Sequence, residues 1–169
     1  MMPTMEKTTV WTVMDSPVGE IRIQARDGAI ARIEFHPYAE LPLGQPLGER
    51  ADDDPLLQRA VEQLTAYFAG VLREFDLPLS PTGTAFQQLV WEQLRLIGYG
   101  ETTSYGVIAG RLGKTTTASR AVGLANGRNP IAIVIPCHRV IGANGTLIGY
   151  AGGLERKKTL LGLEQNVLF

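Results

Sequence analysis

Length, composition and charge exclude several classes of protein. The chain's 169 residues suffice for one domain or two small lobes, and 44% hydrophobic with 20% charged residues is ordinary for a globular protein. A single cysteine excludes an internal disulfide, and one Cys with two His argues against a structural zinc site, so we expect no metal and no cofactor. No apolar run reaches the length of a membrane span or a signal peptide, and we therefore expect a cytoplasmic protein.

The net charge of −1 conceals an asymmetry between the two halves of the chain. Residues 1–80 carry a net charge of −6, whereas residues 81–169 carry +5. A basic C-terminal half is what binding to a polyanion requires, although chance segregation of surface charge is the alternative.

The first half of the sequence has the pattern of a small sheet covered by a helix. Apolar residues alternate with polar ones between Thr8 and Phe35, with turn sequences near residues 15–19 and 26–28, which predicts a β-meander. Three aspartates before Pro55 predict a helix start, and apolar residues recur at helical spacing as far as Leu72. The stretch from Asp76 to Gly83 is the predicted link, so we expect an N-terminal domain over residues 1–80 and a second domain over residues 81–169.

The second half predicts helices joined by tight turns. Thr84 is placed to cap one helix and Ser104 a short helix as far as Leu112, and another short helix is predicted over residues 117–126. The two short helices form a helix-turn-helix pattern. The second is slim and has Arg120 as its only charge, which suits a DNA minor groove, although tight packing in a core would explain it equally well.

The most unusual stretch runs from Asn129 to Val140. We predict a buried strand over residues 131–135 that ends at Pro136, followed at once by a thiol and an imidazole, Cys137 and His138. A lone cysteine is more often a small buried apolar residue than a nucleophile. Its adjacency to a histidine favours a rigidly held nucleophile beside a base.

This stretch resembles the active-site signature of the O6-alkylguanine-DNA alkyltransferases, a family of DNA repair proteins. The resemblance covers about residues 82–165, in the family's order and spacing. It implies an α+β fold with an N-terminal ribonuclease H-like β-sheet lobe and a mostly helical, winged-helix-like C-terminal lobe. The matching segments are Gly83–Gln87, Val90–Trp91, Gly100–Tyr105, Arg120–Gly123, Asn129–Pro130, Pro136–Val140 and Tyr150–Glu164.

The resemblance implies a direct-reversal reaction that consumes the protein. Cys137 would take the alkyl group from guanine O6 once and irreversibly, His138 would remove the thiol proton through a water, and Glu164 would orient His138. Tyr105 would donate to the base ring, and Asn129 would hold the active-site turn.

The family's substrate contacts also have counterparts in this sequence. The carbonyl of Val140 and the N–H of Ala151 would read the guanine edge, and Tyr150 would form a wall of the pocket. Ala132 stands where some relatives have a proline that stacks on bulky benzyl groups, which puts reaction with benzylguanine in doubt.

The implied partner is double-stranded DNA that contains alkylated guanine, with O4-alkylthymine as a second lesion. Arg120 would fill the place of a base flipped out through the minor groove, in a slim helix that includes Ala121 and Gly123. Arg128 would contact phosphate, or else lie solvated at the surface. We expect a monomer, and cooperative assembly on DNA stays open.

Two other functions would use parts of the same sequence. Alkyltransferase-like proteins bind lesions without repairing them, but they lack the reactive cysteine. A cysteine hydrolase would use Cys137, His138 and Glu164, but a thiol and a base adjacent on one turn make that geometry awkward.

Overall fold

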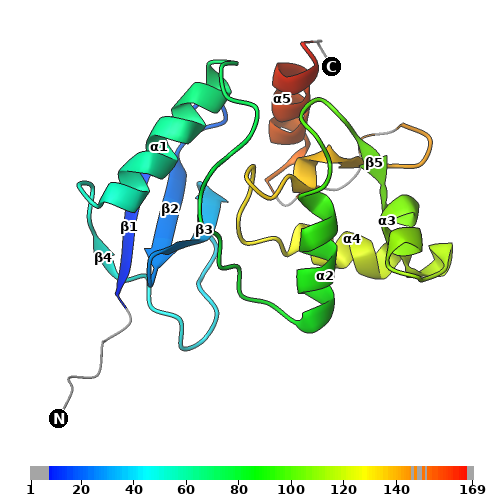
Figure 1. Ribbon diagram of the computed structural model, residues 1–169, viewed down its shortest axis with the longest axis horizontal. Coiled ribbons are helices and arrows are strands. Elements are labelled where there is room, and N and C mark those ends of the chain that lie inside the picture. The colour runs from blue at the N-terminus through cyan, green and yellow to red at the C-terminus, as the bar shows by residue number, and fades with distance from the viewer. Residues whose placement is uncertain (1–7, 146, 148–149, 151, 167–169) are drawn as a thin grey trace.

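The computed structural model describes residues 8–145, 147, 150 and 152–166, apart from the side chain of Thr116. Figure 1 shows the strands β1–β4 and the helix α1 at one end of the molecule, here called the N-terminal lobe, and the helices α2–α5 at the other, the C-terminal lobe. The predicted α+β fold class is confirmed. None of the described helices is long and apolar enough to cross a membrane.

The N-terminal lobe is built on a four-stranded sheet of order β3-β2-β1-β4. The predicted meander forms its antiparallel part, with Val13 opposite Arg22 and Ile23 opposite Ile33, while β4 pairs parallel to β1. The strands are β1 (Thr9–Met14), β2 (Ile21–Arg26), β3 (Ala29–Phe35) and β4 (Glu49–Arg50).

The helix α1 (Pro55–Phe68) covers this sheet, as Figure 1 shows. The side chain of Asp54 accepts a hydrogen bond from the N–H of Leu57 and so caps the helix. The helix ends at Phe68 rather than near Leu72, because Gly70 adopts a φ of +76°, which an α-helix does not accommodate. Its buried face carries Leu57, Ala60, Leu64 and Tyr67.

The free edge of β3 joins the two lobes. Ile30 exchanges backbone hydrogen bonds with residues 78 and 80 of the link. Ile33 donates to the carbonyl of Pro130 at 2.9 Å and accepts from the N–H of Ala132 at 3.1 Å. The N-terminal sheet therefore supports the segment that leads to the cysteine.

Within the described residues, the C-terminal lobe contains four α-helices and a two-stranded parallel pair. Thr84 and Gln87 cap α2 reciprocally, and Ser104 caps α3, as the sequence predicts. The indole N–H of Trp91 donates to the carbonyl of Ala125 at 2.9 Å, which ties α2 to α4. The elements are α2 (Ala85–Leu94), β5 (Thr103–Ser104), α3 (Tyr105–Arg111), α4 (Ser119–Gly127), β6 (Val140–Ile141) and α5 (Leu154–Gln165).

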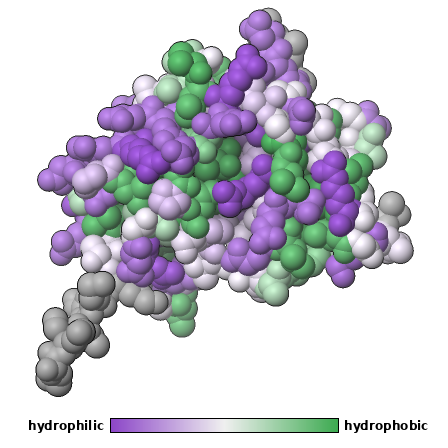
Figure 2. Space-filling model, viewed as in Figure 1, coloured by the Kyte–Doolittle hydropathy of each residue, from purple (hydrophilic) through white to green (hydrophobic). Residues whose placement is uncertain are grey.

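On the face shown in Figure 2, hydrophilic residues are interspersed with smaller apolar patches. The core beneath includes large apolar side chains of both lobes, such as Ile21, Ile33, Trp91 and Leu160. The two lobes thus share one buried interior, and the active-site segment described below lies within it.

Candidate active site

The segment before the cysteine is a tight turn and not the strand predicted from its apolar residues. Only Ile131 makes a β-bridge, to Ile33. Ile133 has a φ of +71°, which reverses the chain and is costly for a β-branched residue. The N–H of Cys137 then donates to the carbonyl of Ile135 at 2.8 Å across Pro136, whose φ of −82° and ψ of 65° form an inverse γ-turn.

The side chain of Asn129 closes this turn from within. Its Nδ2 donates to the carbonyl of Ile135 at 2.7 Å and to that of Ile131 at 3.3 Å, and its Oδ1 accepts from the N–H of Ile131 at 3.0 Å. A second asparagine, Asn126 of α4, donates to the carbonyl of Cys137 at 3.3 Å. The cysteine is therefore fixed from both sides.

Cys137 begins the 3₁₀ turn Cys137–Arg139 and is only 5% exposed. Burial raises the pKa of its thiol, while polar interactions with Asn129 and Tyr150 and the charge of Lys157 oppose that rise. The resting group is therefore a protonated thiol, which needs a base before it can act as a nucleophile.

The thiol borders a cavity of about 580 Å³ between the lobes. β3 and the loop after it supply one wall, and the active-site turn and the start of α5 supply the other. The lining includes Arg32, Phe35, Pro37, Asn129, Ala132, Tyr150 and Arg156.

His138 and Glu164 form a fully buried pair, with Nε2 2.6 Å from Oε2. Burial lowers the pKa of His138 and outweighs the opposing effect of Glu164, so the imidazole is neutral. Burial alone would raise the pKa of Glu164, but the hydrogen bonds from His138 and Arg139 and the positive charge of Arg139 hold it at about 2. Because the carboxylate can only accept, Nε2 carries the proton, and Nδ1 keeps a free lone pair. Nδ1 is buried and has no hydrogen-bond partner in the described part of the chain.

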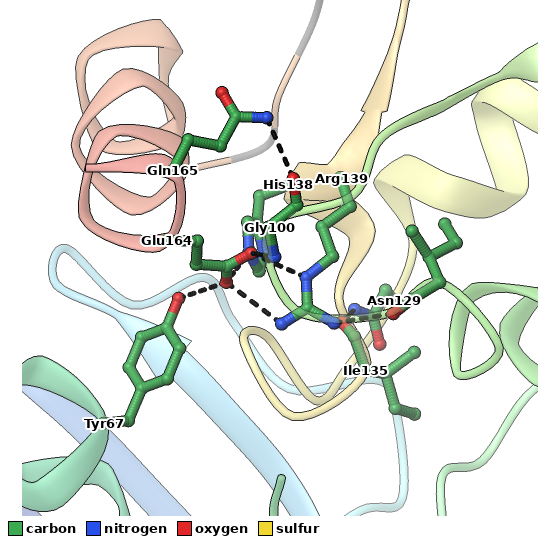
Figure 3. Close-up of polar contacts among 9 residues, drawn as sticks. Tyr67, Gly100, Asn129, Ile135, His138, Arg139, Glu164 and Gln165 are labelled. Atoms are coloured by element: carbon green, nitrogen blue, oxygen red, sulfur yellow. Dashed lines mark hydrogen bonds and ion pairs between the residues drawn. The ribbon is translucent and has the colours of Figure 1, made fainter. Parts of the chain in front are cut away.

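Glu164 is held by three other residues besides the histidine, as Figure 3 shows. Arg139 donates from Nε to Oε1 at 2.8 Å and from a terminal nitrogen to Oε2 at 3.1 Å. The hydroxyl of Tyr67 donates to Oε2 at 2.5 Å, and the N–H of Gly100 approaches Oε1 at 3.4 Å. Together these contacts fix the orientation of the Glu164 carboxylate.

The backbone carbonyl of Val140, the first residue of β6, is held by Lys157. The Nζ of Lys157 donates to this oxygen at 2.6 Å, and the lysine is fully buried. Burial lowers the pKa of Lys157, whereas the nearby Cys137 raises it.

The remaining predicted pocket residues surround the thiol. Tyr105 begins α3 and is half-buried; burial and the nearby Cys137 raise its pKa, so it remains a proton donor. The hydroxyl of Tyr150 is buried beside the thiol and does not form a full hydrogen bond within the described residues. Ala132 lines the cavity, and Ala151 lies outside the described residues.

The helices α3 and α4 form the predicted helix-turn-helix. Arg120, Ala121 and Arg128 are exposed, whereas Val122, Ala125 and Asn126 of α4 are buried. The helix therefore packs on the core with one face and presents the other, with both arginines, at the surface. Gly123 faces the ring of Tyr105, where a Cβ atom would lie 3.8 Å from the ring. Residues 102–154 contain no Asp or Glu, and four of their five Lys and Arg side chains are exposed: Arg111, Lys114, Arg120 and Arg128. This surface suits the phosphate backbone of a nucleic acid.

Reasoning from the sequence missed Tyr67, Asn126 and the roles of Arg139 and Lys157. Periodicity offers a signal for two of them. Tyr67 continues the buried stripe of α1, and Lys157 shares a helical face with the buried Leu160 and Leu161. No cluster of three potential metal-binding His, Cys, Asp or Glu side chains occurs within the described residues.

Comparison with known proteins identifies relatives over nearly the whole chain. Residues 9–81 match the family model "6-O-methylguanine DNA methyltransferase, ribonuclease-like domain", and residues 85–166 match "6-O-methylguanine DNA methyltransferase, DNA binding domain". The methylated-DNA–protein-cysteine methyltransferase of Mycolicibacterium paratuberculosis is 50% identical over 157 residues, 92% of each chain. That of Methanosarcina acetivorans is 46% identical over 157 residues, covering 91% of this chain and 97% of the relative.

Solved structures agree with these matches. The O6-methylguanine methyltransferase of Mycobacterium tuberculosis superposes with a TM-score of 0.84 at 45% identity, over 94% of each chain. A structure from the same bacterium in complex with DNA has a TM-score of 0.82 at 47% identity, over 93% of each chain.

Proposed function

The chain belongs to the 6-O-methylguanine DNA methyltransferase family, and from this premise we propose that Cys137 is the residue that receives the alkyl group. The protein is a DNA repair methyltransferase that transfers a methyl group from DNA to a protein cysteine. One observation carries the assignment of the acceptor. The chain has a single cysteine, and it borders a cavity beside a buried His-Glu pair.

The resting site has a protonated thiol and a neutral imidazole, so a proton must move before attack. The Nδ1 lone pair of His138 accepts the thiol proton through a water molecule, while Nε2–H remains bonded to Glu164. The carboxylate then stabilises the imidazolium that forms. This geometry supports His138 as the base and Glu164 as the group that orients it.

Transfer is an in-line displacement at the alkyl carbon. The thiolate of Cys137 forms the S–C bond as the bond from carbon to guanine O6 breaks, and the electron pair stays on the guanine. The departing base needs a hydrogen-bond donor for this charge, and the phenol of Tyr105 remains protonated for that purpose. The product is a thioether, whose C–S bond is not cleaved by water activated by a histidine, so each molecule repairs one lesion.

Recognition of the base uses backbone groups held in place by buried side chains. Val140 offers its carbonyl to the exocyclic amine of guanine, and Lys157 holds this carbonyl at 2.6 Å. Tyr150 and Ala132 form walls of the same cavity. O4-alkylthymine carries its alkyl group on an equivalent exocyclic oxygen, and we include it as a second substrate.

Access to a base in duplex DNA requires that the nucleotide be flipped out of the stack. The exposed Arg120 at the start of α4 fills the space that the base leaves, and the small Ala121 beside it lets the helix approach the minor groove. The exposed Arg128 at the end of α4 contacts phosphate. The protein acts as a monomer, and its free thiol fits the reducing cytoplasm.

Mass spectrometry of the protein after reaction with DNA that contains O6-methylguanine tests the acceptor. We expect one added methyl group on Cys137 per chain, and the DNA should contain restored guanine. Repair of more than one lesion per chain would indicate turnover and a hydrolytic function. An unmodified protein bound to an unchanged lesion would indicate a lesion-binding protein.

A Cys137→Ser variant separates chemistry from binding. We expect transfer to be abolished while affinity for lesion-containing duplex DNA is retained, because the small side chain does not contribute to the basic surface. Loss of both, with an intact fold, would assign the thiol a structural role.

A further inference from the structure

Glu164 receives a hydrogen bond from the opposite lobe. Tyr67 lies in the penultimate position of α1, 97 residues before Glu164, and its hydroxyl donates to Oε2 at 2.5 Å. This is the oxygen that also contacts Nε2 of His138 at 2.6 Å. Tyr67 is fully buried, as is the Glu164 side chain, so water does not compete for the contact.

The tyrosine can act only as a donor here. Burial and the negative charge of Glu164 both raise the pKa of Tyr67, so its hydroxyl keeps its proton at neutral pH. A neutral hydroxyl that donates to a buried carboxylate forms a charge-assisted hydrogen bond, which is stronger than one between neutral groups.

We propose that Tyr67 is a positioning residue for alkyl transfer, because its hydroxyl fixes the carboxylate oxygen that orients His138 and thereby makes the N-terminal lobe part of the proton relay. This inference rests on the proposed role of His138 as the base. Arg139 holds Glu164 from the side of the active-site turn, and Tyr67 holds it from the side of the sheet (Figure 3). Among the described residues, the hydroxyl of Tyr67 is the only group of the N-terminal lobe that binds Oε2 of Glu164, so its removal breaks this link between the lobes.

The hydroxyl also affects the charge balance around the imidazole. His138 is surrounded by Glu164 and Lys157 of α5 and by Cys137 and Arg139 of its own turn, and Tyr67 of α1 reaches it through Glu164. A donor on Oε2 withdraws negative charge from the carboxylate and weakens its attraction for an imidazolium. His138 therefore stays neutral before the reaction, as a base must.

The aromatic ring of Tyr67 has a separate, structural role. It packs edge-on against Phe68 and Tyr99, with centroid distances of 5.3 and 6.2 Å, and lies 5.5 Å from the ring of Phe75. A Tyr67→Phe variant keeps this packing and removes the hydroxyl alone.

The experiment compares single-turnover transfer from O6-methylguanine duplex DNA by the wild type and by Tyr67→Phe. Loss of one charge-assisted hydrogen bond to the relay should slow transfer about tenfold without changing DNA affinity. The acid limb of the rate profile, which is the fall in rate at low pH, should move to higher pH. Without the hydroxyl of Tyr67 the Glu164 carboxylate is more basic, and it therefore favours protonation of His138. Tyr38→Phe is the matched control, since its hydroxyl donates to the carboxylate of Glu20 at 2.7 Å in the same lobe. We expect its rate and pH profile to match the wild type.

A double-mutant cycle with Glu164→Gln separates this inference from the proposed function. If Tyr67 acts through Glu164, Tyr67→Phe should add little to the loss in the Glu164→Gln background. Unchanged rate and pH profile in Tyr67→Phe, with a slowed Glu164→Gln, would overturn the role of Tyr67 and leave the relay intact. An unaffected Glu164→Gln would overturn the relay itself. A loss in Tyr67→Phe with an unmoved acid limb and matching loss of stability would reduce the tyrosine to a structural role.

Discussion

The Nε of Arg156, in α5, donates to the carbonyl of Val18, in the turn between β1 and β2, at 2.8 Å across 138 residues of sequence. The two terminal nitrogens donate to the carbonyls of Gly152, at 3.1 Å, and His36, at 2.5 Å. The guanidinium also stacks over the ring of Phe35 at 5.0 Å. One side chain therefore connects the N-terminal lobe to the residues that follow Tyr150 in the cavity wall.

An Arg156→Lys variant should be destabilised by about 1–3 kcal/mol, because a single ammonium nitrogen cannot reach three carbonyls that three separate guanidinium nitrogens bind. We also expect slower transfer, since Gly152 loses its connection to the other lobe. Urea denaturation and single-turnover rates measure the two effects. Arg95→Lys, at an exposed position, is the control and should match the wild type. Equal stability of both variants would contradict the connecting role.

A Lys157→Met variant keeps the length of the side chain and removes its charge. Transfer at neutral pH should slow about tenfold, because the carbonyl of Val140 loses a donor and the thiolate of Cys137 loses a nearby positive charge. The basic side of the rate profile should shift to higher pH, since the pKa of Cys137 would rise. Lys158→Met is the matched control, because the adjacent lysine is 41% exposed and pairs only loosely with Glu155 at 3.4 Å. If both variants react like the wild type, the lysine has no part in the reaction.

Local patterns predicted much of the fold. Alternation indicated the meander, the three aspartates before Pro55 indicated the start of α1, and Thr84 and Ser104 were recognised as caps. The helix-turn-helix followed from spacing. The strand predicted over residues 131–135 was wrong because apolar content does not distinguish a buried strand from a buried turn. The turn depends on the side chain of Asn129 and on the positive φ of Ile133, which are tertiary features.

The residues of the candidate site were also only partly predictable from local sequence. Cys137 and His138 are adjacent in sequence, so composition and order drew attention to them, whereas Glu164 was assigned through a family resemblance. Tyr67 could not be connected to the site from the sequence, because its contact depends on how α1 lies against α5. Contacts between distant segments arise from packing, and a single sequence does not record them.

Arg120→Ala should affect repair of duplex DNA much more than reaction with a free guanine analogue. The exposed arginine lies outside the cavity, so its removal leaves the chemistry of Cys137 unchanged but removes the group that fills the stack. A few kcal/mol of unstacking energy would then reduce the duplex rate about 10- to 100-fold. Arg111→Ala, at another exposed arginine of the same lobe, should show a smaller effect. Equal losses on duplex and free analogue would remove the proposed role in base flipping.

The stability of the fold should depend on pH through Glu164. Its pKa of about 2 lies below the ordinary value of 4.5, so its stabilising contribution is complete above about pH 4.5 and is lost as the pH falls toward 2. The difference between these two pKa values corresponds to a contribution of Glu164 to the free energy of unfolding on the order of 3 kcal/mol. The lowered pKa of His138 acts in the same direction, since the unfolded state gains a proton first as the pH falls below 6.5.

Denaturation of the wild type and Glu164→Gln at pH 7, 5, 4 and 3 measures this contribution. We expect the wild type to be more stable at pH 7 and the difference to narrow steadily below pH 4.5, because there the unfolded wild type takes up a proton on Glu164 that the folded protein does not, whereas glutamine binds none. Glu155→Gln is the control, since its side chain is 90% exposed and its profile should run parallel to the wild type. A constant difference between the wild type and Glu164→Gln from pH 7 to pH 3 would show that the carboxylate is not held in its charged form by His138 and Arg139.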